Sequence, residues 1–311
     1  MPNDTTKASK NGEVEPTAPR PYSKTPAFQA MNAARYKRQD MIRAIKQATR
    51  RNLICYVAGQ SQVISRDDVL FFVDLLHNVD RGAPLDLLLH TPGGDMDAAE
   101  KLITMVRNVV GTATLRIIVP DFAKSAGTLM ALGADSIVMS DSSELGPIDP
   151  QIMLPDENGY RISYPIQSYL DAFAEHSASL ARDPGNEAAR MMLGKFEPAR
   201  LKVFEAARRR AREFAEAQLK FGMFRTPKPG KTGNYTEIAS KLLDTDKWLS
   251  HGQMIGHEWA VSIGLNVEYL DPRTEPWALF WQLYCYQRLE VKDKHKIFES
   301  DFVSLLSDEP S

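Results

Sequence analysis

The chain has 311 residues, of which 43% are hydrophobic and 25% are charged, a composition that is ordinary for a globular protein and allows one large α/β domain or two smaller ones. Lys and Arg number 38 against 40 Asp and Glu, and this near balance argues against a nucleic acid as the main partner. Two cysteines are too few for a disulfide framework, and no apolar run approaches the ~20 residues of a membrane span. We therefore expect no transmembrane segment and a reducing, cytoplasmic compartment.

The first 34 residues are rich in polar side chains and prolines and lack a lasting hydrophobic periodicity. A segment of this composition buries too little apolar surface to fold, so residues 1–34 are predicted to form a disordered or loosely docked N-terminal arm. The arm also lacks the apolar core of a secretory signal. Ordered structure is expected to begin near Tyr36, with a weak helical pattern.

Between residues 53 and 139, apolar runs alternate with segments of helical periodicity. The apolar runs predict strands over 53–57, 85–90, 114–119 and 136–139. The helical segments begin near residues 65, 97 and 125, the first of them with Ser65 as its N-cap. This alternation is typical of a parallel sheet between layers of helices, and it predicts an α/β fold.

From residue 164 to residue 224 the pattern becomes mostly helical, and one helix carries an apolar stripe that includes Leu201 and Phe214. The arginines at 208–212 are interpreted as a solvated helix face, because the net charge is close to zero. Residues 226–234 are predicted to be a loop; its Gly-Lys-Thr lacks the first glycine of a Walker A motif. Residues 271–311 are predicted to be a C-terminal extension, whose aromatic run at 277–284 is core or subunit interface.

The strand over 85–90 ends in a glycine turn, His90-Thr91-Pro92-Gly93-Gly94, that opens the next helix. Open α/β sheets place their active sites at such carboxyl ends of parallel strands. Paired glycines adopt backbone geometry that other residues resist, and their exposed N–H groups can bind an oxyanion. On its own, the dipeptide is also explained by a tight strand-to-helix turn.

A second strand-to-helix turn carries the sequence AKSAGT at residues 123–128. Here the Ser125 hydroxyl lies at the positive end of a helix dipole, and the next backbone N–H, on Ala126, can point to where a tetrahedral oxyanion forms. The arrangement follows the logic of a nucleophile elbow without its G-x-S-x-G sequence. Taken alone, Ser125 is also explained as a helix N-cap.

Together, these two turns resemble the serine dehydrogenase proteinase family, a branch of the Clp-protease/crotonase superfamily that is related to signal peptide peptidase A. The matching blocks are HTPGG at 90–94, VPDFAKSAGTLMALGAD at 119–135 and LGPIDPQ at 145–151. A later segment, LSHGQMI at 249–255 with IGLNV at 263–267, is similar to the family's closing block. The resemblance covers residues 53–267, closely in these blocks and loosely between them.

The resemblance implies a Clp-protease/crotonase-like spiral of ββα units over residues 35–270, with a helical insert, assembled as a homo-oligomer. It also implies a serine-type peptidase that acts on peptide or protein substrates. No cofactor is expected. No metal site is expected either, because the segment after His257 lacks the second histidine of a zinc-binding helix.

The resemblance further implies the roles of individual residues. Ser125 is the nucleophile, and His251 and Asp149 are the best matches for its base and for the carboxylate that orients the base. The backbone N–H groups of Gly94 or Gly93, with that of Ala126, form the oxyanion hole. The remaining candidates are His90 for substrate positioning, and Asp244 and Asp246 as substitutes for Asp149.

The chemistry of serine, histidine and aspartate agrees with these roles. A serine hydroxyl is a poor nucleophile until a base takes its proton, and an imidazole is suited to this because histidine ordinarily titrates near neutral pH. A carboxylate then fixes the tautomer and stabilises the imidazolium. The order of the residues along the chain is free, because such triads are defined by geometry.

A lysine base remains open as an alternative, because the related signal peptide peptidases use a lysine beyond the serine. In this chain no lysine lies between Lys124 and Lys195. Lys124 is adjacent to Ser125, and neighbouring residues on a helix do not face each other. A base at Lys195 or Lys202 requires the helical insert to fold over the site.

The leading hypothesis is therefore a cytoplasmic serine peptidase that forms an acyl-enzyme on Ser125. One alternative is a crotonase-type acyl-CoA enzyme, which would share the fold and the oxyanion hole but use no serine nucleophile. The other is a catalytically inactive assembly or adaptor protein, with the N-terminal arm and the aromatic segment as partner-binding extensions.

Overall fold

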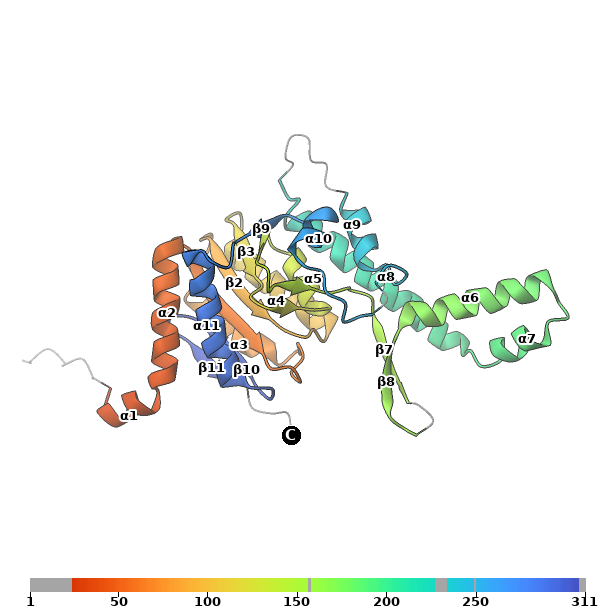
Figure 1. The fold of residues 1–311 in the computed structure, drawn as a ribbon, viewed down its shortest axis with the longest axis horizontal. Coiled ribbons are helices and arrows are strands. Elements are labelled where there is room, and N and C mark those ends of the chain that lie inside the picture. Colours follow the sequence, from red (N-terminus) through yellow and green to blue (C-terminus); the bar gives the residue numbers. More distant parts are fainter. Residues whose placement is uncertain (1–23, 156–157, 227–233, 249, 308–311) are drawn as a thin grey trace, which may run out of the picture.

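The computed structural model describes residues 24–155, 158–226, 234–248 and 250–307. The first 23 residues of the predicted arm and residues 227–233 of the predicted loop lie outside these ranges. A central sheet carries helices on both faces, and an arm of helices and a hairpin extends from this body (Figure 1). Within the described ranges, no helix is both long and apolar enough to span a membrane.

The central sheet has seven strands in the order β11-β10-β1-β2-β3-β5-β9. Its parallel part consists of β1 (Asn52–Ala58), β2 (Leu85–His90), β3 (Leu115–Ile118), β5 (Ser136–Met139) and β9 (Val267–Tyr269). The antiparallel part consists of β10 (Lys296–Glu299), which pairs with β1, and β11 (Ser304–Leu306), which pairs with β10. The expected fold class, a mixed α/β protein on a mostly parallel sheet, is confirmed. The spiral of ββα units stays a prediction.

Each face of the sheet has its own apolar core, because side chains alternate along every strand. One face packs against α3 (Asp68–His77), α4 (Met96–Val110), α5 (Ala126–Leu132) and α8 (Pro198–Phe221). The other face packs against α2 (Ala33–Thr49) and α11 (Glu275–Val291). Along β1, Ile54 and Tyr56 belong to the first core, and Leu53 and Cys55 to the second. Because helices cover both faces of the sheet, every residue of β2 is buried.

The arm in Figure 1 comprises the hairpin of β7 (Gln151–Pro155) and β8 (Arg161–Pro165), followed by α6 (Ile166–Arg182), α7 (Glu187–Leu193) and the start of α8. It contains the helical insert expected from the sequence. The later turns of α8 return to the body, where Phe214 and Leu219 are buried. Arg210 on α8 pairs with Asp97 at 3.2 Å, which agrees with a solvated, ion-paired helix face. The body is completed by α9 (Tyr235–Leu242) and α10 (His257–Ser262).

The described end of the N-terminal arm is helical, which corrects the expectation that order begins near Tyr36. Helix α1 (Pro26–Met31) precedes α2, which starts at Ala33. The signal for α1 is local: Thr25 is its N-cap and accepts a hydrogen bond from Phe28 N at 3.3 Å, and Pro26 takes the first helical position. α1 buries none of its residues, so it is held by little apart from its own hydrogen bonds.

The described part of the 271–311 segment belongs to the central body and is no appendage to it. β10 and β11 extend the sheet beyond β1, and α11 covers one face with Trp277, Phe280 and Tyr284, all of them buried. Most of the aromatic side chains of this run therefore pack in the core, which is one of the two roles that the sequence predicted. A domain boundary at residue 270 would remove two strands of the sheet. Residues 308–311 lie outside the described ranges.

Candidate active site

Segments that follow the central strands lie side by side at the carboxyl ends of those strands, where open α/β sheets bind their ligands. Short pairings join them: Thr91 with Ala123, Ala123 with Leu145, and Leu145 with Ile255. The middle pairing belongs to the short parallel strands β4 (Phe122–Ala123) and β6 (Glu144–Leu145). These contacts bring the glycine turn, the Ser125 turn and the 250–255 segment together, although they are far apart in the chain.

A histidine and an aspartate meet across the antiparallel pairing of Leu145 with Ile255. Leu145 and Ile255 form an isolated bridge, and the segments that continue from it bring the side chains of Asp149 and His251 into contact. His251 Nδ1 lies 2.8 Å from Asp149 Oδ1. Asp149 is only 4% exposed, and Gln151 Nε2 donates a hydrogen bond to its second oxygen. A carboxylate held in this way favours the tautomer with the proton on Nδ1, which leaves His251 Nε2 able to accept a proton.

The two other aspartates considered from the sequence make different contacts. Asp244 Oδ1 accepts hydrogen bonds from the backbone N–H groups of Asp246 and Lys247, at 3.1 and 3.2 Å. Asp244 and Asp246 are both exposed. Of the three candidate aspartates, Asp149 is the one that is hydrogen-bonded to His251.

The two lysines considered as alternative bases belong to the projecting arm. Lys195 follows α7 and lines an apolar pocket between the β7–β8 hairpin and the helices of the arm, together with Tyr164 and Phe196. Lys202, near the start of α8, forms an exposed ion pair with Glu205 at 2.8 Å. A lysine base would require the insert to fold over the start of α5, whereas in Figure 1 the helices α6 and α7 extend away from α5.

Ser125 has an unusual backbone conformation at the start of α5. Its φ is 50° and its ψ is −115°, far from the regions that L-residues ordinarily occupy. It holds the N-cap position of α5, yet its side chain makes no capping hydrogen bond. The simple explanation of this serine as a helix cap therefore does not fit. Such strain, of about 1–3 kcal/mol, is concentrated at functional sites and resembles the sharp turn of a nucleophile elbow.

The glycine turn lies directly against Ser125. A Cβ added to Gly93, whose φ is 111°, would lie 2.8 Å from Ser125 Cβ and 3.3 Å from Ala126 N, so no larger residue fits. Gly93 N donates to Thr91 Oγ1 at 3.2 Å, and Gly93 O accepts from Ile64 N at 2.7 Å. Asp95 N donates to Ile64 O at 2.9 Å, which leaves the N–H of Gly94 outside this bridge.

Lys124, which the sequence analysis considered only as a base, and Thr128, which it did not single out, hold these segments together. Lys124 Nζ donates to the carbonyl oxygens of Leu145, Gly252 and Gln253 at 3.2–3.3 Å and pairs with Glu144 at 2.9 Å. Thr128 Oγ1 donates to Ala123 O at 2.7 Å and accepts from Gly146 N at 3.0 Å. The first set of contacts anchors the backbone next to His251, and the second anchors the segment that leads to Asp149. In the sequence, the only sign of this role is that Lys124 and Thr128 lie on either side of Ser125 in the same short motif.

His90 is buried and packs behind the site. Its ring centroid lies 4.0 Å from that of Phe122 and 5.0 Å from that of Tyr284, and its Nδ1 accepts a long hydrogen bond from Phe122 N at 3.4 Å. Burial, with a smaller contribution from the charge of Arg288, lowers the pKa of His90 to about 3. A fully buried imidazole cannot touch a substrate, so any positioning by His90 acts through the Phe122 segment.

This buried imidazole predicts a specific loss of stability in acid. Below the ordinary pKa of 6.5 the unfolded chain protonates His90, whereas the folded chain does so only near pH 3. The unfolded state thus binds more protons in this window, and the free energy of unfolding should fall by about 1.4 kcal/mol per pH unit as pH decreases. His90→Asn should remove that part of the slope in urea unfolding series at pH ~5, ~6 and ~7.

The matched control for this prediction is His77→Asn, since His77 is exposed at the end of α3. It should keep the slope of the unchanged protein. Equal slopes for the His90 and His77 variants would contradict the argument, because the buried imidazole would then contribute nothing to the pH dependence.

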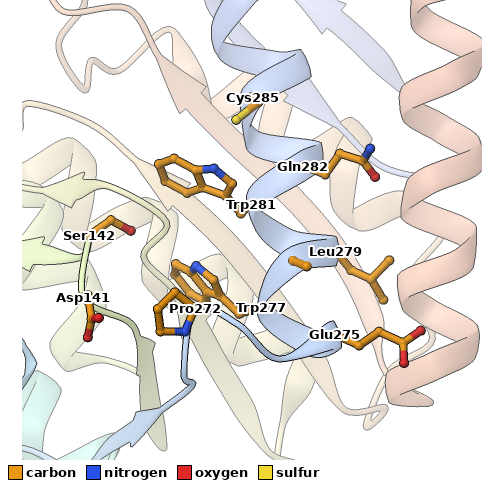
Figure 2. A pocket seen from close by; sticks show the side chains of 10 residues that line it. Asp141, Ser142, Pro272, Glu275, Trp277, Leu279, Trp281, Gln282 and Cys285 are labelled. Carbon is orange, nitrogen blue, oxygen red and sulfur yellow. The ribbon is translucent and has the colours of Figure 1, made fainter.

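A separate pocket of about 680 Å³ lies beside α11. Figure 2 shows Trp277 and Trp281 on this helix, on the side of Asp141 and Ser142, with Cys285 one turn further along. Ser125, Asp149 and His251 are not among the residues that line it. The pocket is therefore distinct from the cluster around Ser125.

Comparison with protein families points to the serine proteinases. A family model described as ClpP-like SDH-type serine proteinase matches residues 25–181. Two uncharacterized proteins of Methanocaldococcus jannaschii match shorter segments: MJ0137 is 39% identical over 100 residues, which is 32% of this chain and 31% of that protein. MJ1495 is 38% identical over 90 residues, which is 29% of this chain and 27% of that protein. The matched segment thus spans less than a third of each of these two relatives.

Among solved structures, the chain is similar to an alanine mutant of the 1510-N membrane-bound stomatin-specific protease, with a TM-score of 0.29, 19% identity, and coverage of 71% of this chain and 98% of that one. A second alanine mutant of that protease, in complex with a substrate peptide, gives a TM-score of 0.28 and 18% identity, with coverage of 76% and 99%.

Proposed function

This chain belongs to the ClpP-like SDH-type serine proteinase family, and we propose that it hydrolyses peptide bonds with Ser125 as the nucleophile, His251 as the general base and Asp149 as the carboxylate that orients the base. The family supports a serine peptidase in general. The assignment of roles to these three residues is our own.

The observation that carries this proposal is the contact between His251 and Asp149 beside the Ser125 turn. The two side chains are 102 residues apart in the chain and meet at 2.8 Å, and the carboxylate is buried. A surface ion pair would not need a buried carboxylate. A histidine whose Nδ1 is bound to a buried carboxylate is the arrangement that serine hydrolysis uses.

In the proposed reaction, Ser125 Oγ attacks the carbonyl carbon of the scissile peptide bond while His251 Nε2 takes the hydroxyl proton. The imidazolium is stabilised by Asp149 and then gives that proton to the leaving amine, as the C–N bond breaks. A water molecule, deprotonated in the same way by His251, then hydrolyses the acyl ester and restores the Ser125 hydroxyl.

The oxyanion of the tetrahedral intermediate would be stabilised by the backbone N–H groups of Ala126 and Gly94. Gly94 is favoured over Gly93 because the N–H of Gly93 already donates to Thr91 Oγ1. The tight contact between Gly93 and the Ser125 turn brings the glycine turn close to the nucleophile. A single donor of this kind is typically worth ~10²–10³ in rate.

The test of the proposal is labelling with a fluorophosphonate, which reacts with an activated serine hydroxyl by displacement of fluoride. Intact-mass analysis of the unchanged protein should find a single adduct, and peptide mapping should place it on Ser125. The Ser125→Ala protein should remain unlabelled, and His251→Ala should react much more slowly. No adduct on the folded, unchanged protein would overturn the proposal and favour the acyl-CoA enzyme or the inactive adaptor; stabilisation by acyl-CoA thioesters would then distinguish these two.

A further inference from the structure

A buried ionic cluster links the C-terminal strand β10 to the first residue of α3 and to the segment that precedes this helix. Lys296 Nζ lies 2.6 Å from Asp68 Oδ1, and the two side chains are 8% and 1% exposed. The same ammonium group donates to Val63 O at 2.8 Å and to Ser65 Oγ at 3.2 Å. The second oxygen of Asp68 accepts from Ser65 N at 2.9 Å. Lys296 thus holds the residues on both sides of Ile64.

Ile64 is the residue that fixes the glycine turn. Its N–H donates to Gly93 O and its carbonyl oxygen accepts from Asp95 N, so it binds the turn on both sides of Gly94. The fit is tight, because a Cβ added to Gly94 would lie 2.5 Å from both Ile64 N and Ile64 O. Displacement of Ile64 would therefore displace Gly94 with it.

The chemistry of the cluster favours a role in geometry over one in stability. Removing two charges from water is costly, and a buried ion pair is often no more stabilising than apolar side chains of similar size. Unlike an apolar contact, an ammonium group with three specific oxygen acceptors fixes the direction of the backbone it binds. Here the bound backbone is the one that orients the glycine turn.

We propose that Lys296 and Asp68 are positioning residues for catalysis: through Val63, Ser65 and Ile64 they hold the N–H of Gly94 in the direction needed to stabilise the oxyanion. This inference rests on the proposed peptidase function. Strand β10 would then contribute to catalysis, although it belongs to the C-terminal segment and all the other residues of the proposed site precede residue 256.

The test is a charge-free double variant, Lys296→Met/Asp68→Asn, in which neither charge is left unpaired in the core. The matched control is Arg38→Met/Glu299→Gln. This pair is also buried and also anchored on β10, with Arg38 Nε 2.9 Å from Glu299 Oε1, but it lies on the other side of the strand, towards α2. Both double variants should lose stability on urea unfolding.

The readouts are kcat and KM for a peptide substrate and the affinity for a peptide boronate, which forms a tetrahedral adduct with the serine. Lys296→Met/Asp68→Asn should lower kcat and boronate affinity by about 10–100-fold, part of the full effect of losing one oxyanion donor, with KM little changed. The Arg38/Glu299 control should change kcat by less than about threefold.

Equal kcat and boronate affinity in the two folded double variants would overturn the positioning role. If the first variant does not fold, Lys296→Gln/Asp68→Asn replaces it, with the same expected direction, because it also leaves no unpaired charge in the core. Failure of both to fold would show a structural cluster and would also overturn the inference. The proposed function is tested separately, since its failure removes activity and fluorophosphonate labelling from the unchanged protein.

Discussion

Ser125→Ala is expected to lower kcat/KM for peptide hydrolysis by ~10³-fold or more, to the background that substrate binding and the oxyanion hole provide. The reason is that no covalent acyl-enzyme can form without Oγ, whereas the remaining contacts to the transition state persist. The replacement should not unfold the protein, because the Ser125 side chain makes no capping hydrogen bond that alanine would lose. The measurement is steady-state hydrolysis of a peptide substrate, with circular dichroism as the check on folding.

The control for this variant is Ser262→Ala, which changes an exposed serine at the end of α10. Its hydroxyl donates to Trp259 O and has no contact with the site, so activity should be unchanged. Full hydrolysis by the Ser125→Ala protein would rule out Ser125 as the nucleophile, and with it the acyl-enzyme mechanism.

His251→Ala should have an effect of similar size, about 10³-fold or more, because the serine hydroxyl then has no base. The same substitution in a Ser125→Ala background should cost little more, since residues that act as one unit are not additive. Asp149→Asn added to His251→Ala should likewise cost little, because the carboxylate acts through the imidazole. Activities of these single and double variants, measured with one peptide substrate, give the couplings directly.

His257→Ala is the matched control, since His257 follows on the same segment but its ring packs against that of Tyr269, with ring centroids 4.4 Å apart. It should retain activity close to that of the unchanged protein. Wild-type activity in His251→Ala would contradict a histidine base and would favour a lysine of the arm, which would then have to reach Ser125 through a change in the arm or from a second subunit.

Local patterns in the sequence were sufficient to predict β1, β2, β3 and β5 and the helices between them. The alternation of apolar runs and amphipathic helices predicted the parallel sheet, because full burial between helix layers requires continuous apolar strands. The paired glycines and the Ser125 turn were recognisable because special backbone geometry demands particular residues, and both glycines and Ser125 have positive φ. The homo-oligomer and the cytoplasmic location stay predictions.

Local patterns were misleading at the two ends of the chain. The polar arm hid α1, whose N-cap Thr25 and first-turn Pro26 are short signals within an otherwise polar segment. The C-terminal segment was expected to be an extension, whereas it belongs to the central sheet; this depends on β10 pairing with β1, more than 230 residues earlier in the chain. Periodicity within a segment does not encode such a partner.

The fold class, the family and the residue types available for the chemistry could all be predicted from local sequence patterns and motifs. Three features required the folded structure: the contact of Asp149 with His251, the hydrogen bond from Gly93 N to Thr91, and the hold of Lys296 on the segment behind the glycine turn. Each of these contacts joins segments that are far apart in the chain, and the periodicity within one segment does not encode which distant segment it will meet.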